Sequence, residues 1–490
     1  MTSAVLPAVE LGWLLPEIVL TIGALVMLVA NVLVPRRSGL LTSLALVVLG
    51  ATLAAVAHVG IGPRLLAGGL LSVDAFAVFF KVTCVGVAML TVLMSHRYLA
   101  IEGMSPGEYH FLILCATLGM LVMAGAVDLV TAFIGLETMA VSFYILSGYL
   151  KPNPRSNEAA VKYFLLGAFS LAILLYGMSL LYAATGTTRL AEIARVAGSG
   201  PRDPRLLLAV VMVAAGLGFK IAAVPFHMWA PDVYEGAPTP VTAFLSVGSK
   251  AASFALLIRL FAQGLPGLAA DWESLLGVIA VLTMTTGNLA ALTQSNIKRM
   301  LAYSSIAHAG YVLIGLVAGS ERGIAAVLFY LPAYALMQLG AFAVVVLLRR
   351  ADAIGDELKD LAGLHQRQPF AAFAMLLFLL ALGGTPPTAG FMGKFRLFAA
   401  AIDSGHVWLA VAGVLNSVVS LYYYLRIVMF MYQRTDAPAS SPALSPLLAG
   451  TIGVAAFGTV AAGVYPALLI DAADVSARAL GALSAVAVIR

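Results

Sequence analysis

Three lysines lie in segments of the sequence that are otherwise apolar: Lys220, Lys250 and Lys394. A glutamate, Glu137, lies in a fourth apolar segment, AFIGLETMAVSFY. A charge at the centre of a bilayer costs about 2.5–3.5 kcal/mol on insertion scales, so each of these side chains is expected to have a partner or a use. Ammonium and carboxylate groups at this depth can hold and release protons. The four residues therefore predict a path for protons or other ions through a membrane.

Lysine suits such a path because its proton affinity depends on its surroundings, whereas arginine stays charged. Moving a neighbouring carboxylate, or wetting the cavity, can switch a buried lysine between holding and releasing its proton. A static ion pair that only fixes helix packing is the alternative for any single Lys–Glu pair. Three buried lysines, two of them beside helix breaks, favour the path.

Several other residues are candidates for a secondary relay. Histidine as a residue type ordinarily titrates near neutrality, so His227 and His308 could pass protons, or they could be core histidines bonded to backbone carbonyls. His227 is two turns after Lys220, which predicts one shared helix face. Lys162 follows Glu158 by four residues, which fits either a surface pair or a feeder of the path.

Other polar residues have simpler explanations. Glu108, which begins an apolar span, is a further candidate for the secondary relay, although a plain interfacial position is slightly favoured. Snorkelling or helix-end placement accounts for Lys81, Arg259, Arg396 and Arg426. The tyrosine run 422–424 is interpreted as helix packing.

The composition is that of an all-α integral membrane protein. Of 490 residues, 61% are hydrophobic and 10% are charged, against about 25% charged in soluble domains. No segment is large and polar enough for a separate soluble domain, and there is no glycine-rich phosphate loop or metal-spaced Cys/His cluster. We therefore expect no cofactor or metal in this chain, and no nucleic-acid partner. The net charge of +5 is scattered over short loops.

Apolar runs long enough to cross a bilayer predict about fourteen transmembrane helices. The predicted spans are 12–34, 40–58, 73–95, 109–125, 129–150, 157–183, 205–229, 239–262, 273–293, 302–318, 321–348, 370–401, 407–431 and 443–468. We interpret residues 1–490 as one polytopic membrane domain with four parts: three N-terminal spans (1–108), a first five-helix repeat (109–262), a second five-helix repeat (273–431), and the last span with its tail (443–490).

Spans 7 and 12 are predicted to be interrupted. Pro225 follows Lys220 by five residues in span 7, and Pro386 and Pro387 precede Lys394 in span 12. Proline has no N–H and clashes with the carbonyl four residues back. The two broken spans are five apart, as in an inverted repeat of spans 4–8 and 9–13, and paired broken helices are typical of a transporter site.

The distribution of basic residues predicts the orientation. An even number of spans places both termini on one side, and more Lys and Arg residues lie in loops after odd-numbered spans than after even-numbered ones. The positive-inside rule then places the odd loops in the cytoplasm and both termini on the periplasmic side.

Three stretches resemble the antiporter-like membrane subunits of respiratory complex I. They are FKIAAVPFHMWAPDVYEGAPTPVTAFLSVGSKAASF (219–254), NIKRMLAYSSIAHAGY (296–311) and GGTPPTAGFMGKF (383–395). The resemblance extends over spans 4–13 and is shared with multisubunit cation/proton antiporters. The subunit N branch is favoured by the sequences HMWAPDVYEGAPTP and GFMGKF, and by Lys394, where a sibling subunit has glutamate.

The resemblance implies a role for each main residue. Glu137 and Lys220 are implied to pair at the channel centre, Lys250 to connect toward the cytoplasm, and Lys394 to serve the outward half-channel. Tyr303 lies in a matching motif, as His227 and His308 do, and these three are implied as secondary relay or structural positions.

The resemblance further implies a proton-translocating subunit of a NADH:quinone oxidoreductase in a bacterial inner membrane. It implies that flavin, Fe–S clusters and the quinone site lie in partner subunits, and that neighbours include sibling antiporter-like subunits and the lipid bilayer. Two alternatives stay open: a subunit of a multisubunit sodium/proton antiporter, and a non-conducting scaffold of the membrane arm.

Overall fold

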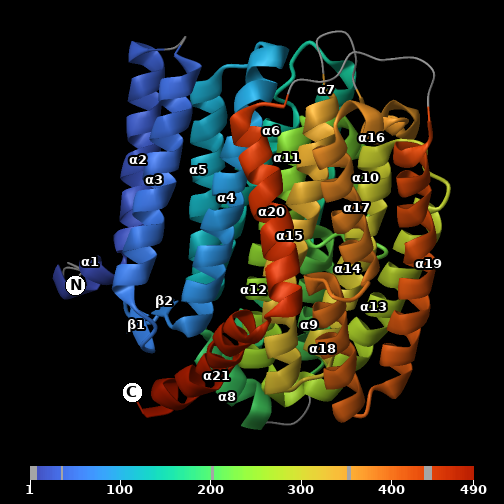
Figure 1. The fold of residues 1–490 in the computed structure, drawn as a ribbon. Helices are drawn as coiled ribbons and strands as arrows, with labels where there is room; N and C mark the ends of the chain where they lie inside the picture. The colour runs from blue at the N-terminus through green and yellow to red at the C-terminus, as the bar shows by residue number, and fades with distance from the viewer. Residues whose placement is uncertain (1–7, 35–36, 200–202, 350–354, 435–443, 490) are drawn as a thin grey trace.

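A computed structural model describes residues 8–34, 37–199, 203–349, 355–434 and 444–489. The outermost residues of the predicted first and last parts, 1–7 and 490, lie outside the described residues. The chain forms a bundle of long helices that run side by side (Figure 1). In that view, the upper end of the bundle holds the start of α7, and the lower end holds the short β1–β2 hairpin, α8 and α21.

The helices and strands have the following bounds: α1 (Ala8–Trp13), α2 (Leu15–Leu33), α3 (Ser38–Val59), β1 (Arg64–Leu66), β2 (Leu71–Val73), α4 (Ala75–Glu102), α5 (Pro106–Gly125), α6 (Leu129–Ser147), α7 (Pro154–Thr185), α8 (Leu190–Ser199), α9 (Pro204–Lys220), α10 (Trp229–Gly236), α11 (Thr239–Phe244), η1 (Leu245–Ser249), α12 (Lys250–Ile258), η2 (Arg259–Gly264), η3 (Pro266–Leu268), α13 (Ala269–Ala291), α14 (Ile297–Val317), α15 (Glu321–Leu348), η4 (Leu358–Leu361), α16 (Leu364–Arg367), α17 (Pro369–Gly383), α18 (Ala389–Asp403), α19 (Val407–Tyr432), α20 (Pro446–Val464) and α21 (Ala467–Ile489).

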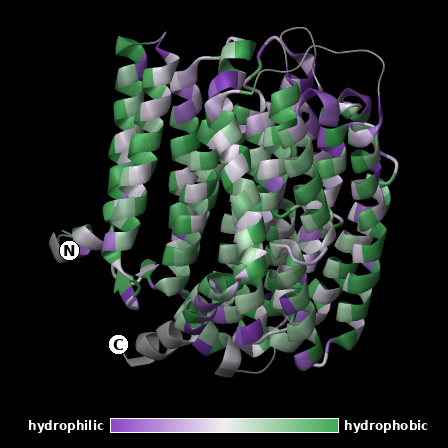
Figure 2. Cartoon of the chain, viewed as in Figure 1, coloured by the Kyte–Doolittle hydropathy of each residue, from purple (hydrophilic) through white to green (hydrophobic). Residues whose placement is uncertain are grey.

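The membrane fold predicted from the sequence is confirmed. Within the described ranges, 12 helical runs are long and apolar enough to cross a membrane, and each overlaps a predicted span. Hydrophobic residues predominate along the length of the helices, and hydrophilic residues gather toward the two ends of the bundle (Figure 2). The count of fourteen and the division into repeats stay predictions, since spans 7 and 12 each consist of two shorter helices.

Polar residues at the bundle ends start several of these helices. The side chains of Asp128, Asn153 and Asn296 accept backbone N–H groups at the first turns of α6, α7 and α14. Such caps satisfy donors that have no partner within the helix. The most deeply buried runs are the one from α11 to η2, α14 and α15. They form the centre of the bundle, where any polar side chain must find a protein partner.

The two predicted breaks are present. Span 7 is α9 and α10, and the residues between them hold Pro225. The Val224 N–H, which has no helical acceptor, donates to Thr283 Oγ1 at 2.9 Å. The indole of Trp229 donates at 2.9 Å to the Phe219 carbonyl, which also accepts from the Ala222 N–H. Irregular backbone at membrane depth requires such partners.

Three elements at the lower end were not predicted. The strands β1 and β2 form an antiparallel hairpin, α8 is a short amphipathic helix, and α21 occupies what the sequence indicated as a tail. They are too short or too polar for a search based on long apolar runs.

Two buried ion pairs fasten α4 to its neighbours. Arg259 and Asp74 are both 0% exposed and lie 2.9 Å apart, while Lys81 lies 2.5 Å from Glu17. The interpretation of Lys81 and Arg259 as snorkelling or helix-end residues is therefore wrong. Their charges are neutralised inside the bundle, where a carboxylate partner is required.

Replacing Asp74 by alanine would leave the Arg259 guanidinium buried without its carboxylate, and should lower the free energy of unfolding by about 3–5 kcal/mol. The measurement is the thermal unfolding midpoint of the purified protein in detergent. Arg205→Gln is the control, because it removes an exposed pair with Asp203 and should leave the midpoint unchanged. Equal midpoints for the two variants would contradict a stabilising role for the buried pair.

Candidate functional site

The three lysines singled out from the sequence are buried in the structure. Lys220 is 1% exposed, Lys250 is 3% exposed and Lys394 is 4% exposed. Lys220 is the last residue of α9, Lys250 the first residue of α12, and Lys394 lies in α18 just after the second break. Each lies where a helix is interrupted or changes its pitch, so backbone geometry positions all three.

Lys250 is bonded to α14. Its Nζ donates to both the carbonyl oxygen and the Oγ of Ser305, each at 2.6 Å. The hydroxyl of Tyr234 on α10 lies 3.4 Å from the same Oγ. The π-helical turn η1 directly precedes Lys250, and such wide turns are frequent at functional sites.

His308 joins three helices at the centre of the bundle. Its Nδ1 lies 2.5 Å from the Tyr330 hydroxyl on α15, and its Nε2 lies 3.1 Å from the Tyr424 hydroxyl on α19. Tyr424 in turn lies 2.6 Å from Ser304 Oγ. The interpretation of the tyrosine run as packing alone is therefore wrong for Tyr424. An imidazole with both nitrogens bonded can accept a proton on one side and donate on the other.

Lys394 reaches back across the second break. Its Nζ donates to the carbonyls of Leu382 and Gly383 at 3.1 Å each, and lies 4.6 Å from the centre of the Tyr311 ring. These carbonyls belong to the last turn of α17, where no helical N–H is available and the helix dipole is negative. The break therefore supplies the acceptors that a buried ammonium requires.

These groups share one face of α14. Ser304, His308 and Tyr311 are spaced by four and three residues, which places them on one side of a helix, with Ser305 beside them. We refer to the following residues as the α14 chain: Lys250, Ser305, Ser304, Tyr424, His308, Tyr330 and Lys394. Among the described residues, no direct hydrogen bond joins Ser305 to Ser304 or His308 to Lys394. Both Lys250 and Lys394 lie within electrostatic range of His308.

Lys220 lies in an aromatic pocket of its own. Its Nζ donates to the Tyr144 hydroxyl at 3.2 Å and lies 5.4 Å from the Tyr144 ring centre. The Tyr163 ring packs against Tyr144 with centroids 4.8 Å apart, and stacks on Trp229 at 4.5 Å. A neutral hydroxyl and ring faces therefore surround this ammonium.

The predicted direct pairing of Glu137 with Lys220 is not formed. Between these two described residues there is no ion pair within 4.0 Å, although their charges lie within electrostatic range. Tyr144, two turns after Glu137 on α6, takes the position next to the lysine. The Oε1 atom of Glu137 is buried without a hydrogen-bond partner in the described part of the chain. Sequence could not reveal this, because it depends on side-chain distances across helices.

The short helix α10 connects the Lys220 pocket with the α14 chain. Its first residue, Trp229, stacks on Tyr163 beside Lys220. Its Tyr234 contacts the same Ser305 that accepts from Lys250. The upper half of the broken span therefore touches both groups.

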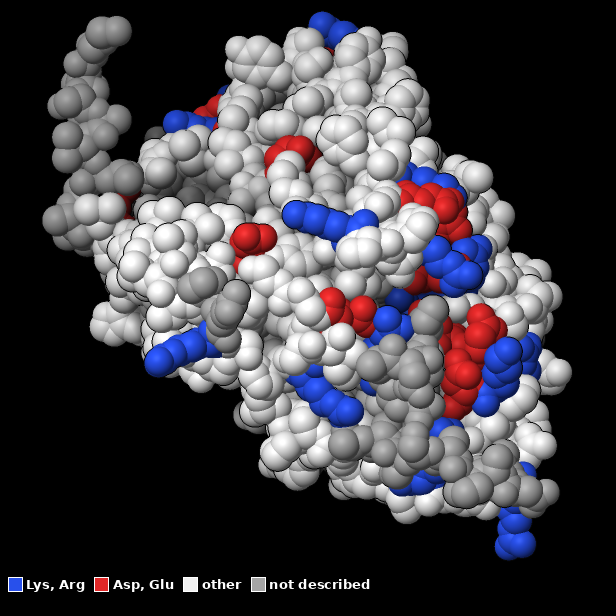
Figure 3. All heavy atoms as spheres, turned by 90° about the horizontal axis from the view of Figure 1, so that it is seen from above, with Lys and Arg blue, Asp and Glu red and all other residues white. Residues whose placement is uncertain are grey.

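Lys162 belongs to a surface network at the upper end. It lies 2.6 Å from both Glu158 and Asp232, and Arg299 lies 2.7 Å from Asp232. Acidic and basic side chains adjoin one another on this end of the molecule (Figure 3). The network surrounds a hollow of about 160 Å³. With 41% of its side chain exposed, Lys162 is part of an external ion-pair cluster, and its role in feeding the path stays a prediction.

Lys298 is a further buried lysine, which the sequence placed in a loop. It donates to the carbonyls of Glu235 and Ala237 at 2.6 and 2.7 Å, and Asp356 lies 3.8 Å away. Burial raises the pKa of the Asp356 carboxyl, and the nearby ammonium of Lys298 opposes that shift. This lysine therefore has a carboxylate within reach, unlike those of the α14 chain.

Three predicted relay residues lie apart from these groups. His227 lies in the segment between α9 and α10, so it shares no helix with Lys220, and its Nδ1 has no partner among the described atoms. Glu108 is exposed in the first turn of α5, with the Tyr149 hydroxyl 3.4 Å away. Tyr303 is half-buried on another face of α14. The structure brings none of the three into the α14 chain.

Sequence reasoning missed five uncharged residues that bond within the two sites: Tyr144, Ser304, Ser305, Tyr330 and Tyr424. The spacing of Ser305 and His308 within SSIAHAGY could have indicated a shared polar face. Single tyrosines in apolar spans give no such signal. In the part of the chain that the structure describes, no group of three or more His, Cys, Asp or Glu residues could hold a metal ion.

Comparisons with known proteins agree with the resemblance seen in the motifs. The family described as NADH:quinone oxidoreductase/Mrp antiporter, transmembrane, matches residues 126–420. The chain is 46% identical to NADH-quinone oxidoreductase subunit N of Trichlorobacter lovleyi, over 95% of this chain and 96% of that protein. It is 47% identical to subunit N 2 of Rhizobium meliloti, over 97% and 99% of the two chains.

A solved structure is similar as well. A chain of respiratory complex I from Thermus thermophilus with bound aureothin superposes with a TM-score of 0.81 at 33% identity, covering 93% of this chain and 98% of that one. The likeness therefore extends over nearly the whole bundle.

Replacing Gly384 by alanine should loosen the second break. Gly384 has φ +88°, and an added Cβ would lie 3.0 Å from Lys394 Cδ. Alanine costs about 1–2 kcal/mol in this left-handed conformation, so hydrogen exchange of the Gly384 and Thr385 amides should accelerate about 5–30-fold. Mass spectrometry of the purified protein measures this exchange.

Gly383→Ala is the matched control for that change. Gly383 has no positive φ, and its added Cβ would lie 3.1 Å from Leu421 Cδ1 and 3.7 Å from Tyr424 Cδ2, without approaching Lys394. Equal acceleration in both variants would show that neither the left-handed conformation nor Lys394 sets the rate.

Proposed function

Since the chain belongs to the NADH-quinone oxidoreductase subunit N family, we propose that it moves protons across the membrane as an antiporter-like subunit of such an oxidoreductase. Electron transfer from NADH to quinone takes place in other subunits of the complex. This chain supplies a proton path and no redox chemistry of its own.

One observation carries the proposal: in the part of the chain that the structure describes, the three central lysines are bonded only to neutral groups. Lys220 donates to a tyrosine hydroxyl, Lys250 to a serine and Lys394 to two carbonyls. The buried cations Lys81 and Arg259, in contrast, each contact a carboxylate. A lysine with neutral acceptors can lose its proton without leaving an unpaired buried carboxylate, which would cost several kcal/mol.

The path begins with Lys220 and its modulator Glu137. A lysine near a carboxylate holds its proton more firmly than one without, so a movement that separates the two charges favours release. Because Lys220 is bonded to Tyr144 rather than to Glu137, a small rearrangement of α6 or α9 would change the distance between the two charges. Through α10, the same movement reaches Ser305 and Lys250.

The α14 chain carries the proton onward. Lys250 exchanges with the Ser305 hydroxyl, and His308 connects the tyrosines of α15 and α19 by its two nitrogens. Lys394 receives the proton at the second break and releases it toward the lower end. Hydroxyl groups suit these steps because each can accept and donate.

Coupling to quinone reduction requires a two-state element that a distant event can bias. The Glu137–Lys220 arrangement is that element here. A conformational or electrostatic signal from neighbouring subunits changes the separation of Glu137 and Lys220. The central lysines then exchange protons.

The chain is a multi-pass protein of a membrane respiratory complex. Both termini face the periplasm in our proposal, which makes the upper end cytoplasmic. The first and last helices, α1 and α21, both lie toward the lower end (Figure 1), which supports a shared side. Its partners are the other membrane subunits, including sibling antiporter-like chains, and flavin, Fe–S clusters and quinone bind elsewhere in the complex.

Lys220→Arg should abolish the contribution of this chain to proton pumping, because arginine keeps its proton at any working pH. The measurement is protons moved per NADH oxidised, in membranes where a native gel confirms assembly. Lys151→Arg, the same change at an exposed loop position, is the control and should pump normally.

Other outcomes separate the alternatives. Wild-type pumping by Lys220→Arg would contradict proton release by Lys220 and favour a scaffold role. Transport that requires sodium in a complex without NADH oxidation would favour a sodium/proton antiporter.

Tyr424→Phe should slow pumping by about two- to tenfold, since it removes a hydroxyl that bridges Ser304 and His308 and is worth about 0.5–1.5 kcal/mol. Tyr422→Phe provides the control from the same run, because Tyr422 is 62% exposed. The assay is again the pumping ratio in assembled membranes. Equal ratios for both variants would exclude the Tyr424 hydroxyl from the path.

A further inference from the structure

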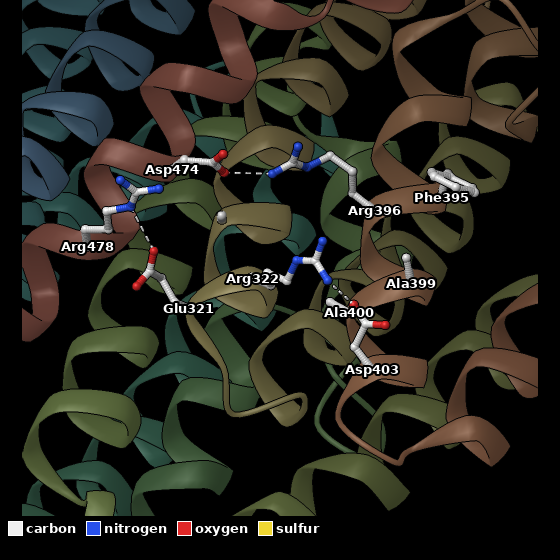
Figure 4. Close-up of a pocket in the computed structure, with 10 residues that line it drawn as sticks. Glu321, Arg322, Phe395, Arg396, Ala399, Ala400, Asp403, Asp474 and Arg478 are labelled. Atoms are coloured by element: carbon white, nitrogen blue, oxygen red, sulfur yellow. Dashed lines mark hydrogen bonds and ion pairs between the residues drawn. The ribbon is translucent and has the colours of Figure 1, made fainter.

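Three helices at the lower end are joined by a closed ring of ion pairs. Each of α15, α18 and α21 contributes one cation and one anion, and the pairs link them in turn (Figure 4). The pairs are Arg322–Asp403 at 2.5 Å, Arg396–Asp474 at 2.8 Å and Arg478–Glu321 at 3.0 Å. The ring lines a pocket of about 370 Å³. None of these six residues entered the proton path described above.

The three pairs differ in exposure. The Arg396 and Asp474 side chains are 21% and 36% exposed, whereas those of the other two pairs are 50–78% exposed. Exposed pairs contribute little, because water and salt screen them. The Arg396–Asp474 pair, which is the pair of the ring that joins α18 to α21, is therefore the strongest of the three. The sequence-based interpretation of Arg396 as a snorkelling or helix-end residue is wrong, since its guanidinium is paired.

Arg396 follows Lys394 by two residues on α18. Two residues correspond to about 200° around a helix, so the two side chains leave α18 on nearly opposite sides. Lys394 reaches the α17 carbonyls. Arg396 reaches Asp474 on α21 (Figure 4). A rotation or shift of α18 changes both contacts together.

A third contact shows how closely α18 lies against α15. A Cβ added at Gly393 would be 2.5 Å from the Tyr330 ring, so the helix backbone approaches the tyrosine that bonds His308. The Arg396 guanidinium also lies 5.8 Å from the ring of Phe329, the residue before Tyr330. A shift of α18 would therefore move Lys394 and would also move the backbone that packs against Tyr330, the partner of His308.

We propose that Arg396 is a positioning residue for Lys394: its ion pair with Asp474 holds α18 so that the Lys394 ammonium stays on the carbonyls of the second break. The inference rests on the proposed proton path and adds to it a residue that touches no proton carrier. The C-terminal helix α21 thereby takes part in setting when Lys394 gives up its proton.

The groups around Lys394 determine how a shift of α18 would change its proton affinity. Its nearest titratable groups are Tyr311 and His308 of α14, with Tyr330 of α15 and Tyr424 of α19 beyond them. None of these is a carboxylate, so the α17 carbonyls are the main groups that hold the ammonium. Loosening α18 removes those acceptors.

The experiment measures the pumping ratio against pH in membranes with confirmed assembly. Arg396→Gln and Asp474→Asn should each move the alkaline limb of the profile to lower pH by about one unit, because the ammonium loses its carbonyl acceptors. Since both remove the same ion pair, the double variant should match either single one. Arg396→Lys keeps a cation and should retain most of the wild-type profile.

Two further variants separate positioning from folding. The charge swap Arg396→Asp with Asp474→Arg should restore the profile, and the 370 Å³ pocket leaves room for the exchanged side chains. Arg478→Gln removes an exposed pair one turn further along α21 and should change nothing. An unchanged profile in assembled Arg396→Gln, additive single effects, or no rescue by the swap would each overturn the proposal.

The outcome is distinguishable from a failure of the proton path itself. If Lys220→Arg stops pumping while Arg396→Gln pumps with a wild-type profile, the path stands and only the positioning role fails. If Lys220→Arg also pumps normally, the path has failed first.

Discussion

Polar backbone groups at membrane depth must find partners inside the protein, and this constraint shapes the centre of the bundle. The second break leaves the carbonyls of Leu382 and Gly383 without helical donors, and Lys394 donates to both. At the first break the Val224 N–H donates to Thr283 Oγ1, and the Phe219 carbonyl accepts from the Trp229 indole as well as from the Ala222 N–H. A buried ammonium is tolerable where the chain itself creates acceptors. The lysine and the broken helix therefore stabilise each other. The carbonyls that accept from the Lys394 ammonium can also keep the side chain in place while its proton is exchanged.

An unbroken helix supplies the continuity that the broken spans lack. α14 is almost wholly buried, so its Ser305 and His308 can only be satisfied by neighbouring helices. These partners come from α12, α15 and α19. Because the bonds of α14 are shared among several helices, a small shift of one of these helices would alter the proton path locally. For this reason, the hydrogen bonds of the α14 chain can rearrange inside a tightly packed bundle.

The sequence predicted the features that are costly in hydrocarbon. Lysines and prolines in apolar spans stand out because each needs compensation, and Lys394 and both breaks were found on that basis. Uncharged partners such as Tyr330 carry no comparable cost, so nothing in the sequence shows which of many tyrosines faces a histidine. The resemblance implied a direct Glu137–Lys220 pair, and the two residues lie at similar predicted depths in separate spans. Depth alone does not show which side chain lies beside the lysine, and in the structure it is Tyr144. The β1–β2 hairpin, α8 and α21 were missed because the prediction relied on long apolar runs.

Two kinds of buried charge are therefore present in one bundle. Those that fasten helices, such as Arg259 with Asp74, have a carboxylate in contact, and removing a proton or a partner would leave an isolated charge. The central lysines have hydroxyls and carbonyls, which accept from an ammonium and lose little when it becomes neutral. A scaffold would gain nothing from neutral acceptors at these positions, because a carboxylate would hold each helix more firmly. The choice of partner, rather than the presence of a buried lysine, is what separates a structural charge from one that can titrate in a working cycle.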